Sequence, residues 1–159
     1  MGIRVGHGFD IHRTVENRPL ILAGVEVESL FGLQGHSDAD VVLHALVDAI
    51  LGALARGDIG EYFLDNDPQY KDANSELFVE GALEVLKEEG YSIGNVDATI
   101  VAQKPKLVAY KPLMKTRLAR LLGVEENRIN IKAKTHEEVG PLGQGEAIEA
   151  HVVVLLETA

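Results

Sequence analysis

The sequence predicts an α/β (α+β) fold in which a mixed β-sheet packs against helices as a single-domain sandwich. Short runs rich in Ile, Val and Leu alternate with longer segments whose apolar residues recur at helical spacing, and Gly, Asn and Pro separate them. The chain has 159 residues, of which 46% are hydrophobic, and this suits one compact core. We therefore expect residues 1–159 to form a single domain.

The N-terminal part is expected to contain two strands and one long helix. The strands are predicted at residues 2–9 and 20–28, with the turn-forming residues 17–19 between them. Ser37, with an aspartate three residues on, resembles a capping box for an apolar helix over residues 38–55.

An irregular acidic segment and a second helix should follow. Glycines within residues 57–60 break the first helix, and the sequence Asp65-Asn66-Asp67-Pro68 continues a loop of a length that is usually functional. Ser75 is expected to cap the second helix, which ends at Gly90. Its apolar stripe consists of Leu77, Phe78, Ala82, Val85 and Leu86.

The C-terminal half is predicted to alternate strand, helix and two further strands. Residues 96–102 read as a buried strand, and Pro112 suits the first turn of a third helix that stops at Gly123. The inward residues of this helix are expected to be Leu113, Met114, Leu118, Leu121 and Leu122. The last strands are predicted at residues 129–132 and 148–156.

Composition and charge exclude several classes of function. A formal net charge of -10 argues against a nucleic-acid binder, which normally carries a basic face. No membrane segment or signal peptide is recognisable, so we expect a cytoplasmic protein with no membrane partner. The chain has no cysteine, so His, Asp and Glu must hold any metal. An acidic protein that binds a phosphorylated substrate needs local positive charge, which a divalent cation supplies.

Asp10 and His12 form the first group of candidate functional residues, at the end of the first predicted strand. Side chains two residues apart on an extended backbone point to the same side, so this pair is able to present two metal ligands together. The alternative is a polar pair that simply ends a strand.

His44 and two aspartates interrupt the otherwise apolar first helix. Asp40, His44 and Asp48 are spaced by four residues and predict one polar ridge. His44 is then either a core histidine hydrogen-bonded to Asp40 or Asp48, or a metal ligand, and the two interpretations are compatible. With Asp10 and His12 it would complete a site of two histidines and one carboxylate with an open fourth position. Such a site is typical of catalytic zinc, with Mn or Fe as alternatives.

Residues 134–137 form a third polar group, with the sequence Lys-Thr-His-Glu, and a glycine-rich segment over residues 140–146 follows it. The hydroxyl of Thr135 and the carboxylate of Glu137 suit a phosphate oxygen and a second, hard cation. The alternative is a polar turn whose glycines meet backbone demands.

Several of these motifs together resemble the family of 2-C-methyl-D-erythritol 2,4-cyclodiphosphate synthases over essentially the whole chain. The matching segments lie at residues 6–12 (GHGFDIH), 36–40 (HSDAD, with His44), 57–60 (GDIG), 65–68 (DNDP), 94–97 (GNVD) and 102–106 (AQKPK). The resemblance implies an enzyme that converts 4-diphosphocytidyl-2-C-methyl-D-erythritol 2-phosphate to the cyclic diphosphate and releases CMP, in non-mevalonate isoprenoid biosynthesis. Two rival hypotheses remain, a zinc-dependent hydrolase and a non-catalytic trimeric module that binds an isoprenoid.

The resemblance also implies the cofactors and the assembly. Asp10, His12 and His44 would bind Zn2+, and Glu137 together with the substrate phosphates would bind Mg2+ or Mn2+. The family forms a homotrimer around a central cavity lined by sheets, with active sites at the subunit interfaces.

Roles for individual residues follow from the same resemblance. His36 and Thr135 would be the catalytic residues. Residues implied in substrate binding are Asp10, His12, His36, Ser37, Asp58, Ile59, Gly60, Phe63, Asp65, Asp67, Ala102, Lys106, Lys134, Thr135, His136, Glu137 and Gln144. Gln144 stands where the family often has Arg, and Lys134 and His136 stand where Thr is common.

Overall fold

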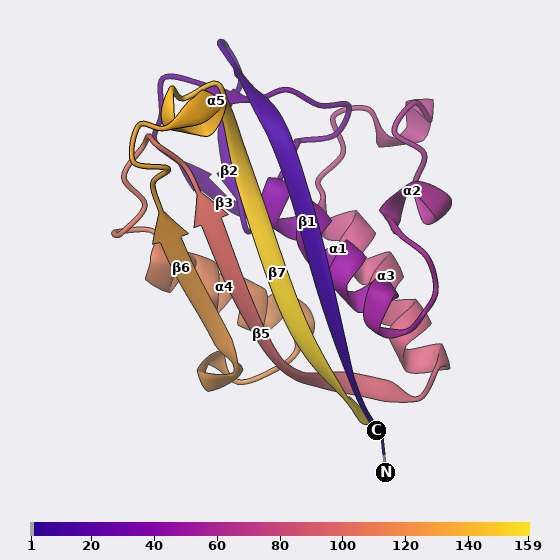
Figure 1. Cartoon of the computed structure of the whole chain (residues 1–159). Helices are drawn as coiled ribbons and strands as arrows, with labels where there is room; N and C mark the ends of the chain where they lie inside the picture. Colours follow the sequence, from indigo (N-terminus) through magenta and orange to yellow (C-terminus); the bar gives the residue numbers. More distant parts are fainter. Residues whose placement is uncertain (1) are drawn as a thin grey trace.

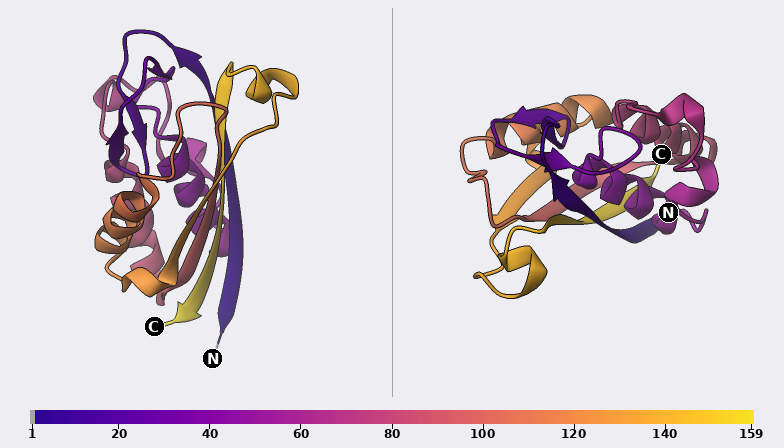
Figure 2. Two further views of the ribbon diagram at one scale, coloured as in Figure 1. Left: turned by 90° about the vertical axis from the view of Figure 1, so that its left-hand side faces the viewer. Right: turned by 90° about the horizontal axis from the view of Figure 1, so that it is seen from above.

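The computed structural model describes residues 2–159 and shows one mixed sheet with the long helices on one of its faces (Figures 1 and 2). The strands lie in the order β4-β1-β7-β5-β6, in which β5 and β6 are parallel and the other neighbours antiparallel. Their bounds are β1 Ile3–Val15, β4 Gly32–Leu33, β5 Tyr91–Val101, β6 Ile129–Lys134 and β7 Ala147–Thr158. The predicted mixed α/β sandwich is confirmed.

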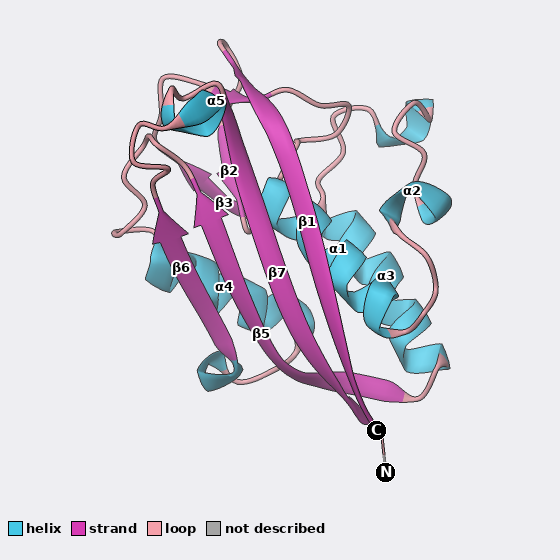
Figure 3. Cartoon of the chain, viewed as in Figure 1, coloured by secondary structure: helices cyan, strands magenta, loops and turns pink. Residues whose placement is uncertain are grey.

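Three long helices form the second layer, as predicted, and two short ones lie in the loops (Figure 3). The long helices are α1 (Val41–Ala53), α3 (Glu76–Glu88) and α4 (Lys111–Leu122), and the short ones are α2 (Ile59–Tyr62) and α5 (Gly140–Gly143). Two 3-10 turns, at Pro68–Tyr70 and Glu126–Arg128, complete the set. No helix within residues 2–159 combines the length and the apolar character that crossing a bilayer requires.

The prediction of one strand over residues 20–28 is wrong. This segment forms a separate hairpin of β2 (Leu20–Leu22) and β3 (Val25–Val27). Ala23 and Gly24 make the turn with φ of 53° and 75°, and Asp40 accepts hydrogen bonds from both of their N–H groups. A distant carboxylate therefore stabilises the left-handed turn, which an apolar run does not reveal.

The predicted capping box at Ser37 is also wrong, because α1 begins later. Asp40 is the N-cap and its carboxylate accepts hydrogen bonds from the N–H groups of Val42 and Leu43, at 3.2 and 3.1 Å. Ala39 has a φ of 59°, so the chain before Asp40 is not helical. Asp40 thus joins the β2–β3 turn to the start of α1.

Ser75 does occupy the N-cap position of α3, but its side chain makes no capping hydrogen bond. Two leucines that were expected to face inward point to solvent instead. Leu77 in α3 is 47% exposed and Leu113 in α4 is 56% exposed, because each lies in the first turn of its helix, beyond the edge of the core.

β1 is longer than predicted and packs directly against α1. The strand continues through the motif at residues 6–12 to Val15, paired with β7 along most of its length. A Cβ atom on Gly6 would lie 1.9 Å from the carbonyl oxygen of Ala49, and one on Gly8 would lie 1.7 Å from that of Ala45. The two glycines therefore allow α1 to rest on the backbone of β1, which determines where His44 lies relative to the strand.

Candidate active site

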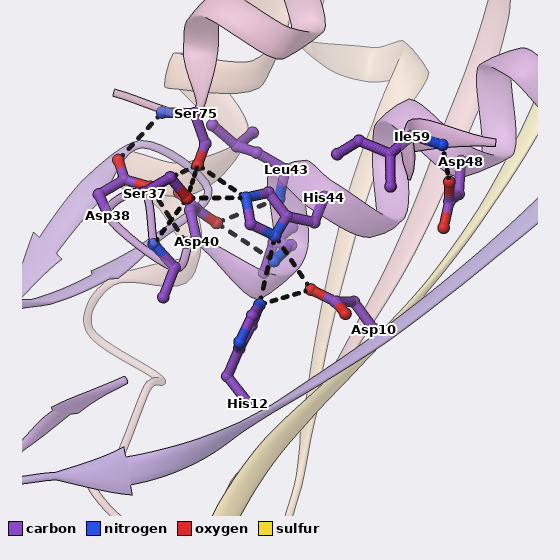
Figure 4. A network of polar contacts seen from close by, with 12 residues as sticks. Asp10, His12, Ser37, Asp38, Asp40, Leu43, His44, Asp48, Ile59 and Ser75 are labelled. Atoms are coloured by element: carbon purple, nitrogen blue, oxygen red, sulfur yellow. Dashed lines mark hydrogen bonds and ion pairs between the residues drawn. The ribbon is translucent and has the colours of Figure 1, made fainter. Parts of the chain in front are cut away.

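Asp10 and His12 lie on the helix-facing side of β1, opposite His44 in the first turn of α1 (Figure 4). The even-numbered positions of β1 include Gly6 and Gly8, which contact α1, so Asp10 and His12 point the same way as those glycines. The prediction that the two side chains share one side of an extended strand is confirmed. The strand does not end at this pair, so the alternative of a polar strand terminus is wrong.

Three side-chain atoms of this group form a compact triangle. Asp10 Oδ2 lies 2.8 Å from His12 Nε2 and 3.1 Å from His44 Nδ1, and the two nitrogens are 3.2 Å apart. Ligands of a tetrahedral zinc ion with bonds near 2.0–2.1 Å are separated by about 3.3 Å. The triangle therefore has the size of one face of a zinc tetrahedron, and its donor set suits the ion.

The electrostatics of the group favour an ionised carboxylate. Burial raises the pKa of Asp10, but hydrogen bonds from His12 and His44 outweigh this and hold it at about 2. Burial lowers the pKa of His12, whereas its hydrogen bond and charge interaction with Asp10 raise it, and the net shift is upward. A cation placed among these groups would meet a negative charge at neutral pH.

The predicted polar ridge on α1 is not a single feature. Asp40 turns toward the β2–β3 hairpin, and Asp48 accepts a hydrogen bond from the N–H of Ile59 at 2.7 Å. Neither carboxylate bonds to His44, so the interpretation of His44 as a core histidine held by Asp40 or Asp48 is wrong. Helical spacing places side chains on one face but does not determine which distant partner each one meets.

The far side of His44 is occupied by two serines that the sequence did not single out as its partners. Its Nε2 atom lies 2.9 Å from Ser75 Oγ and 3.2 Å from Ser37 Oγ (Figure 4). Ser75 is in addition hydrogen-bonded through its hydroxyl to Asp38. Ser37 and Ser75 were each predicted to cap a helix, and the resemblance implied substrate binding for Ser37, but no signal in the sequence indicated a contact of either serine with His44.

A pocket of about 300 Å³ opens beside the triangle and collects many of the predicted substrate-binding residues. The predicted residues in its wall are Asp10, His36, Ser37, Ile59, Gly60, Phe63 and Asp65, next to His44. Leu64, Tyr70 and Phe78 complete the wall. Leu64 lies in the segment of residues 63–67 that the resemblance implies for the substrate, whereas Tyr70 and Phe78 were missed as site residues. Asp58 caps α2 at the rim, and His36 Nε2 lies 2.7 Å from the carbonyl oxygen of Asp67.

A second pocket of about 310 Å³ lies at the C-terminal ends of β5 and β6. Ala102, Lys106, Lys134 and Thr135 are the predicted residues in its wall, and Lys111 adds a third lysine. The two pockets share no lining residue. In Figure 1 the ends of β5 and β6 lie on the left of the sheet, whereas α2, which borders the first pocket, lies on the right.

The remaining predicted residues lie on the loop after β6, outside both pockets. Glu137 is exposed, has a φ of 51° and donates its N–H to Thr135 Oγ1 at 3.2 Å. His136 Nδ1 lies 2.7 Å from the carbonyl oxygen of Val139, and Gln144 Nε2 donates to the carbonyl oxygen of Glu138. The structure thus does not bring this loop together with the Asp10–His12–His44 group within one chain.

The fold and the site define a mixed α/β protein with a candidate metal centre at the mouth of a small-molecule pocket. The chain belongs to the YgbB family, which matches residues 3–157. It is 55% identical over 155 residues to the 2-C-methyl-D-erythritol 2,4-cyclodiphosphate synthase of Geobacter metallireducens, with 98% of this chain and 99% of that one covered. The synthase of Trichlorobacter lovleyi is 53% identical over 154 residues, which cover 97% of this chain and 98% of the relative.

Solved structures give the same result. The bifunctional IspDF of Campylobacter jejuni superposes with a TM-score of 0.95 at 43% identity, covering 99% of this chain and 43% of that longer one. The CDP complex of IspF from Plasmodium falciparum has a TM-score of 0.87 at 37% identity, covering 99% of this chain and 97% of the other. The resemblance to the cyclodiphosphate synthase family is therefore confirmed.

Proposed function

We propose that the chain converts 4-diphosphocytidyl-2-C-methyl-D-erythritol 2-phosphate to 2-C-methyl-D-erythritol 2,4-cyclodiphosphate with release of CMP, as a phosphorus-oxygen lyase of non-mevalonate isoprenoid biosynthesis. The observation that carries the proposal is the Asp10–His12–His44 triangle, which has the size of a zinc-tetrahedron face and opens into a pocket. Full-length relatives that carry the synthase name support it.

The triangle would hold Zn2+ through Asp10 Oδ2, His12 Nε2 and His44 Nδ1. When bound, the ion would act as a Lewis acid toward a phosphoryl oxygen at the open coordination position. Ser37 and His44 line the pocket next to that position, so this chain's own side chains shape the space in which the β-phosphate would lie.

The first pocket is proposed to hold the methylerythritol part of the substrate. Asp58, Ile59 and Gly60 at the start of α2 and Phe63, Asp65 and Asp67 beyond it supply carboxylates and backbone groups for hydroxyls, and an aromatic wall for the carbon chain. The segment that carries His36 and Ser37 is attached at both ends. Arg18 donates hydrogen bonds to the carbonyl oxygens of Gly35 and Ser37 at 2.6 and 2.5 Å.

The second pocket is proposed to hold the cytidine and its phosphates. Ala102 and neighbouring apolar residues offer a surface for the base, and Lys106, Lys111 and Lys134 bring positive charge to a chain with a formal net charge of -10. Thr135 would contact a phosphate, and the nearby His136 and Gln144 would complete the edge of the site. Glu137 would ligate a Mg2+ or Mn2+ ion that bridges the phosphates.

A homotrimer with active sites between subunits would combine the two pockets. The face of the sheet opposite the long helices carries apolar side chains, of which Ile3 is 68% and Val5 is 65% exposed, followed by Phe9 and Ile11 on the same side of β1. An apolar sheet face of this kind normally packs against another protein surface. Packing of three such faces would form a central cavity lined by sheets.

The single-domain organisation and the cytoplasmic location stay predictions from the sequence.

The reaction needs no general base from the protein, because the substrate carries its own nucleophile. An oxygen of the 2-phosphate attacks the β-phosphorus, the bond from that phosphorus to the oxygen of CMP breaks, and CMP leaves with the electron pair. The chain's residues have to fold the substrate into line and exclude water. His36 on one side and Thr135 on the other would donate hydrogen bonds to the phosphoryl oxygens as charge builds on them.

Phosphorus NMR of the purified protein with the diphosphocytidyl substrate, Zn2+ and Mg2+ tests the proposal. Cyclisation gives the resonances of a cyclic diphosphate together with CMP, which is the expected result. Linear phosphates would instead identify a zinc-dependent hydrolase that uses water. An unchanged substrate spectrum with a bound isoprenoid diphosphate would identify a non-catalytic binding module.

A further inference from the structure

On the side of His44 that faces away from the candidate metal centre lie two polar residues in succession, the buried Ser75 and the half-buried Asp38. Ser75 is fully buried at the start of α3, and its Oγ lies 2.9 Å from His44 Nε2. The same Oγ is hydrogen-bonded to Asp38 Oδ1. Figure 4 shows His44, Ser75 and Asp38 in succession, on the side of His44 away from Asp10 and His12.

The donors and acceptors that Asp38, Ser75 and His44 possess determine the direction of each hydrogen bond between them. An ionised carboxylate accepts only, so the single proton of the Ser75 hydroxyl must be donated to Asp38. Ser75 Oγ then presents lone pairs to His44, so Nε2 of His44 must carry the proton of that bond. When a metal ion is bound, the imidazole keeps this proton on Nε2 and offers the lone pair of its other nitrogen, Nδ1, to the ion. Nδ1 is the atom that faces Asp10 and His12.

Asp38 is itself fixed by the backbone, which makes it a stable partner for Ser75. Its Oδ2 accepts the N–H of Ser75 at 3.1 Å and its Oδ1 accepts the N–H of Asp40 at 3.1 Å. The carboxylate thus connects the starts of α1 and α3, the two helices that carry His44 and Ser75. Any rotation of the Ser75 hydroxyl away from Asp38 would cost a charge-assisted hydrogen bond.

We propose that Ser75 and Asp38 are positioning residues that hold His44 in the tautomer and orientation needed for metal binding through Nδ1. This inference rests on the proposed metal site and adds two residues to it. Groups that accept a hydrogen bond from a metal-bound histidine typically contribute about 10- to 100-fold to metal affinity.

A purely structural role for Ser75 makes a different prediction. If Ser75 served only to start α3, its removal would lower the stability of the protein and leave metal affinity unchanged. Its side chain makes no capping bond, so the loss of the hydroxyl removes no helix cap. The positioning role therefore predicts a large fall in metal affinity, in addition to any loss of stability that follows from breaking the hydrogen bond between Ser75 and Asp38.

Zinc affinity, measured by competition with a chromophoric chelator, separates these roles. We expect Ser75→Ala to bind Zn2+ about 10- to 100-fold more weakly than wild type, and Ser75→Thr, which keeps the hydroxyl, to lie closer to wild type than Ser75→Ala does. Ser37→Ala is the matched comparison, because Ser37 Oγ is the second atom near Nε2, at 3.2 Å. We expect Ser37→Ala to stay near the wild-type affinity, and an effect equal to that of Ser75→Ala would overturn the assignment of Ser75.

NMR of the zinc-loaded protein provides a readout that does not depend on affinity. The Nε2–H proton of His44 should give a resonance that exchanges slowly with water in wild type and rapidly in Ser75→Ala. Equal zinc affinity and equal exchange in wild type and Ser75→Ala would overturn the inference alone. A wild-type protein that binds no zinc would contradict the proposed metal site as well, so the two failures are distinguishable.

Discussion

Two regions of the proposed active site, the Asp10–His12–His44 centre and the loop after β6, differ in how their side chains are held. The centre is assembled within one chain from β1 and α1, and its side chains contact one another at 2.8–3.2 Å. Thr135, Glu137 and Gln144 lie on an exposed loop, where their contacts are local and involve the loop's own backbone.

This difference indicates which part of the site depends on other molecules. The centre is complete before any substrate or second subunit arrives, so it should bind zinc in an isolated chain. Gln103 accepts hydrogen bonds from two backbone N–H groups of the loop, but within residues 2–159 the side chains of Thr135, Glu137 and Gln144 make no hydrogen bond outside it. These side chains would acquire their role only with substrate phosphates and a neighbouring subunit in place. Changes to the centre should therefore alter metal content, whereas changes to the loop should alter catalysis alone.

The largest effect is expected from His12→Ala. Loss of one of three protein ligands should remove the tightly bound zinc and lower kcat/KM by about 1,000-fold or more, since Lewis-acid stabilisation contributes several kcal/mol. Zinc content by mass spectrometry of metals, steady-state kinetics and the melting temperature are the measurements. A variant that keeps full zinc and near-normal kinetics would remove His12 from the centre.

Removal of the metal should have an equally large but reversible effect. Dialysis of the wild-type protein against a strong chelator should abolish activity, and addition of Zn2+ with Mg2+ should restore it, because the proposed mechanism uses Zn2+ at the centre and Mg2+ at Glu137. The recovery is measured as initial rate against metal concentration. Full activity in a rigorously metal-stripped sample would contradict the account.

The packing that positions the centre can be broken without touching a ligand. Gly8→Ala would place a Cβ 1.7 Å from the carbonyl oxygen of Ala45, so α1 must move and the free energy of unfolding should fall by about 3 kcal/mol. Gly52→Ala in α1, the helix that Gly8 contacts, is the matched control, because a Cβ on Gly52 meets nothing within 4 Å. It should increase stability by about 0.5–1 kcal/mol. Denaturant unfolding of both variants measures the difference, and equal values would refute the close approach of β1 and α1.

Glu137→Gln should affect the loop and leave the centre unchanged. We expect kcat to fall by about 10- to 100-fold, since the neutral amide is a poorer ligand for a hard cation, and the Mg2+ concentration needed for half-maximal rate to rise. Zinc content should equal that of the wild type. A loss of zinc in this variant would show that the two regions are not separate.

The smallest effect concerns proton competition at the centre. Because Asp10 raises the pKa of His12, that histidine keeps its proton to a higher pH than an ordinary imidazole in the metal-free chain. Zinc must displace this proton, so apparent affinity should fall by about tenfold per pH unit for each proton displaced as pH drops below the His12 pKa. Competition titrations between pH 5 and about 8 measure the slope. A flat profile would indicate that His12 is not a ligand.

The comparison also explains what the sequence was able to predict. Asp10 and His12 could be predicted as site residues because side chains two residues apart on a strand point to the same side, and His44 stood out as a polar side chain in an apolar helix. The roles of Ser75 and Asp38 could not be predicted. They depend on the contact of Ser75 with His44, 31 positions away, and with Asp38, 37 positions away. The β2–β3 turn was missed for the same reason, because the carboxylate of Asp40 holds it from a distance.

Diffraction from crystals of the zinc-loaded protein, recorded on both sides of the zinc absorption edge, tests the central claim most directly. The account predicts one strong anomalous peak bonded to Asp10 Oδ2, His12 Nε2 and His44 Nδ1 at about 2.0–2.2 Å, with the fourth position facing the pocket. A peak located elsewhere, or an ion whose fourth ligand is another side chain of the protein, would contradict it.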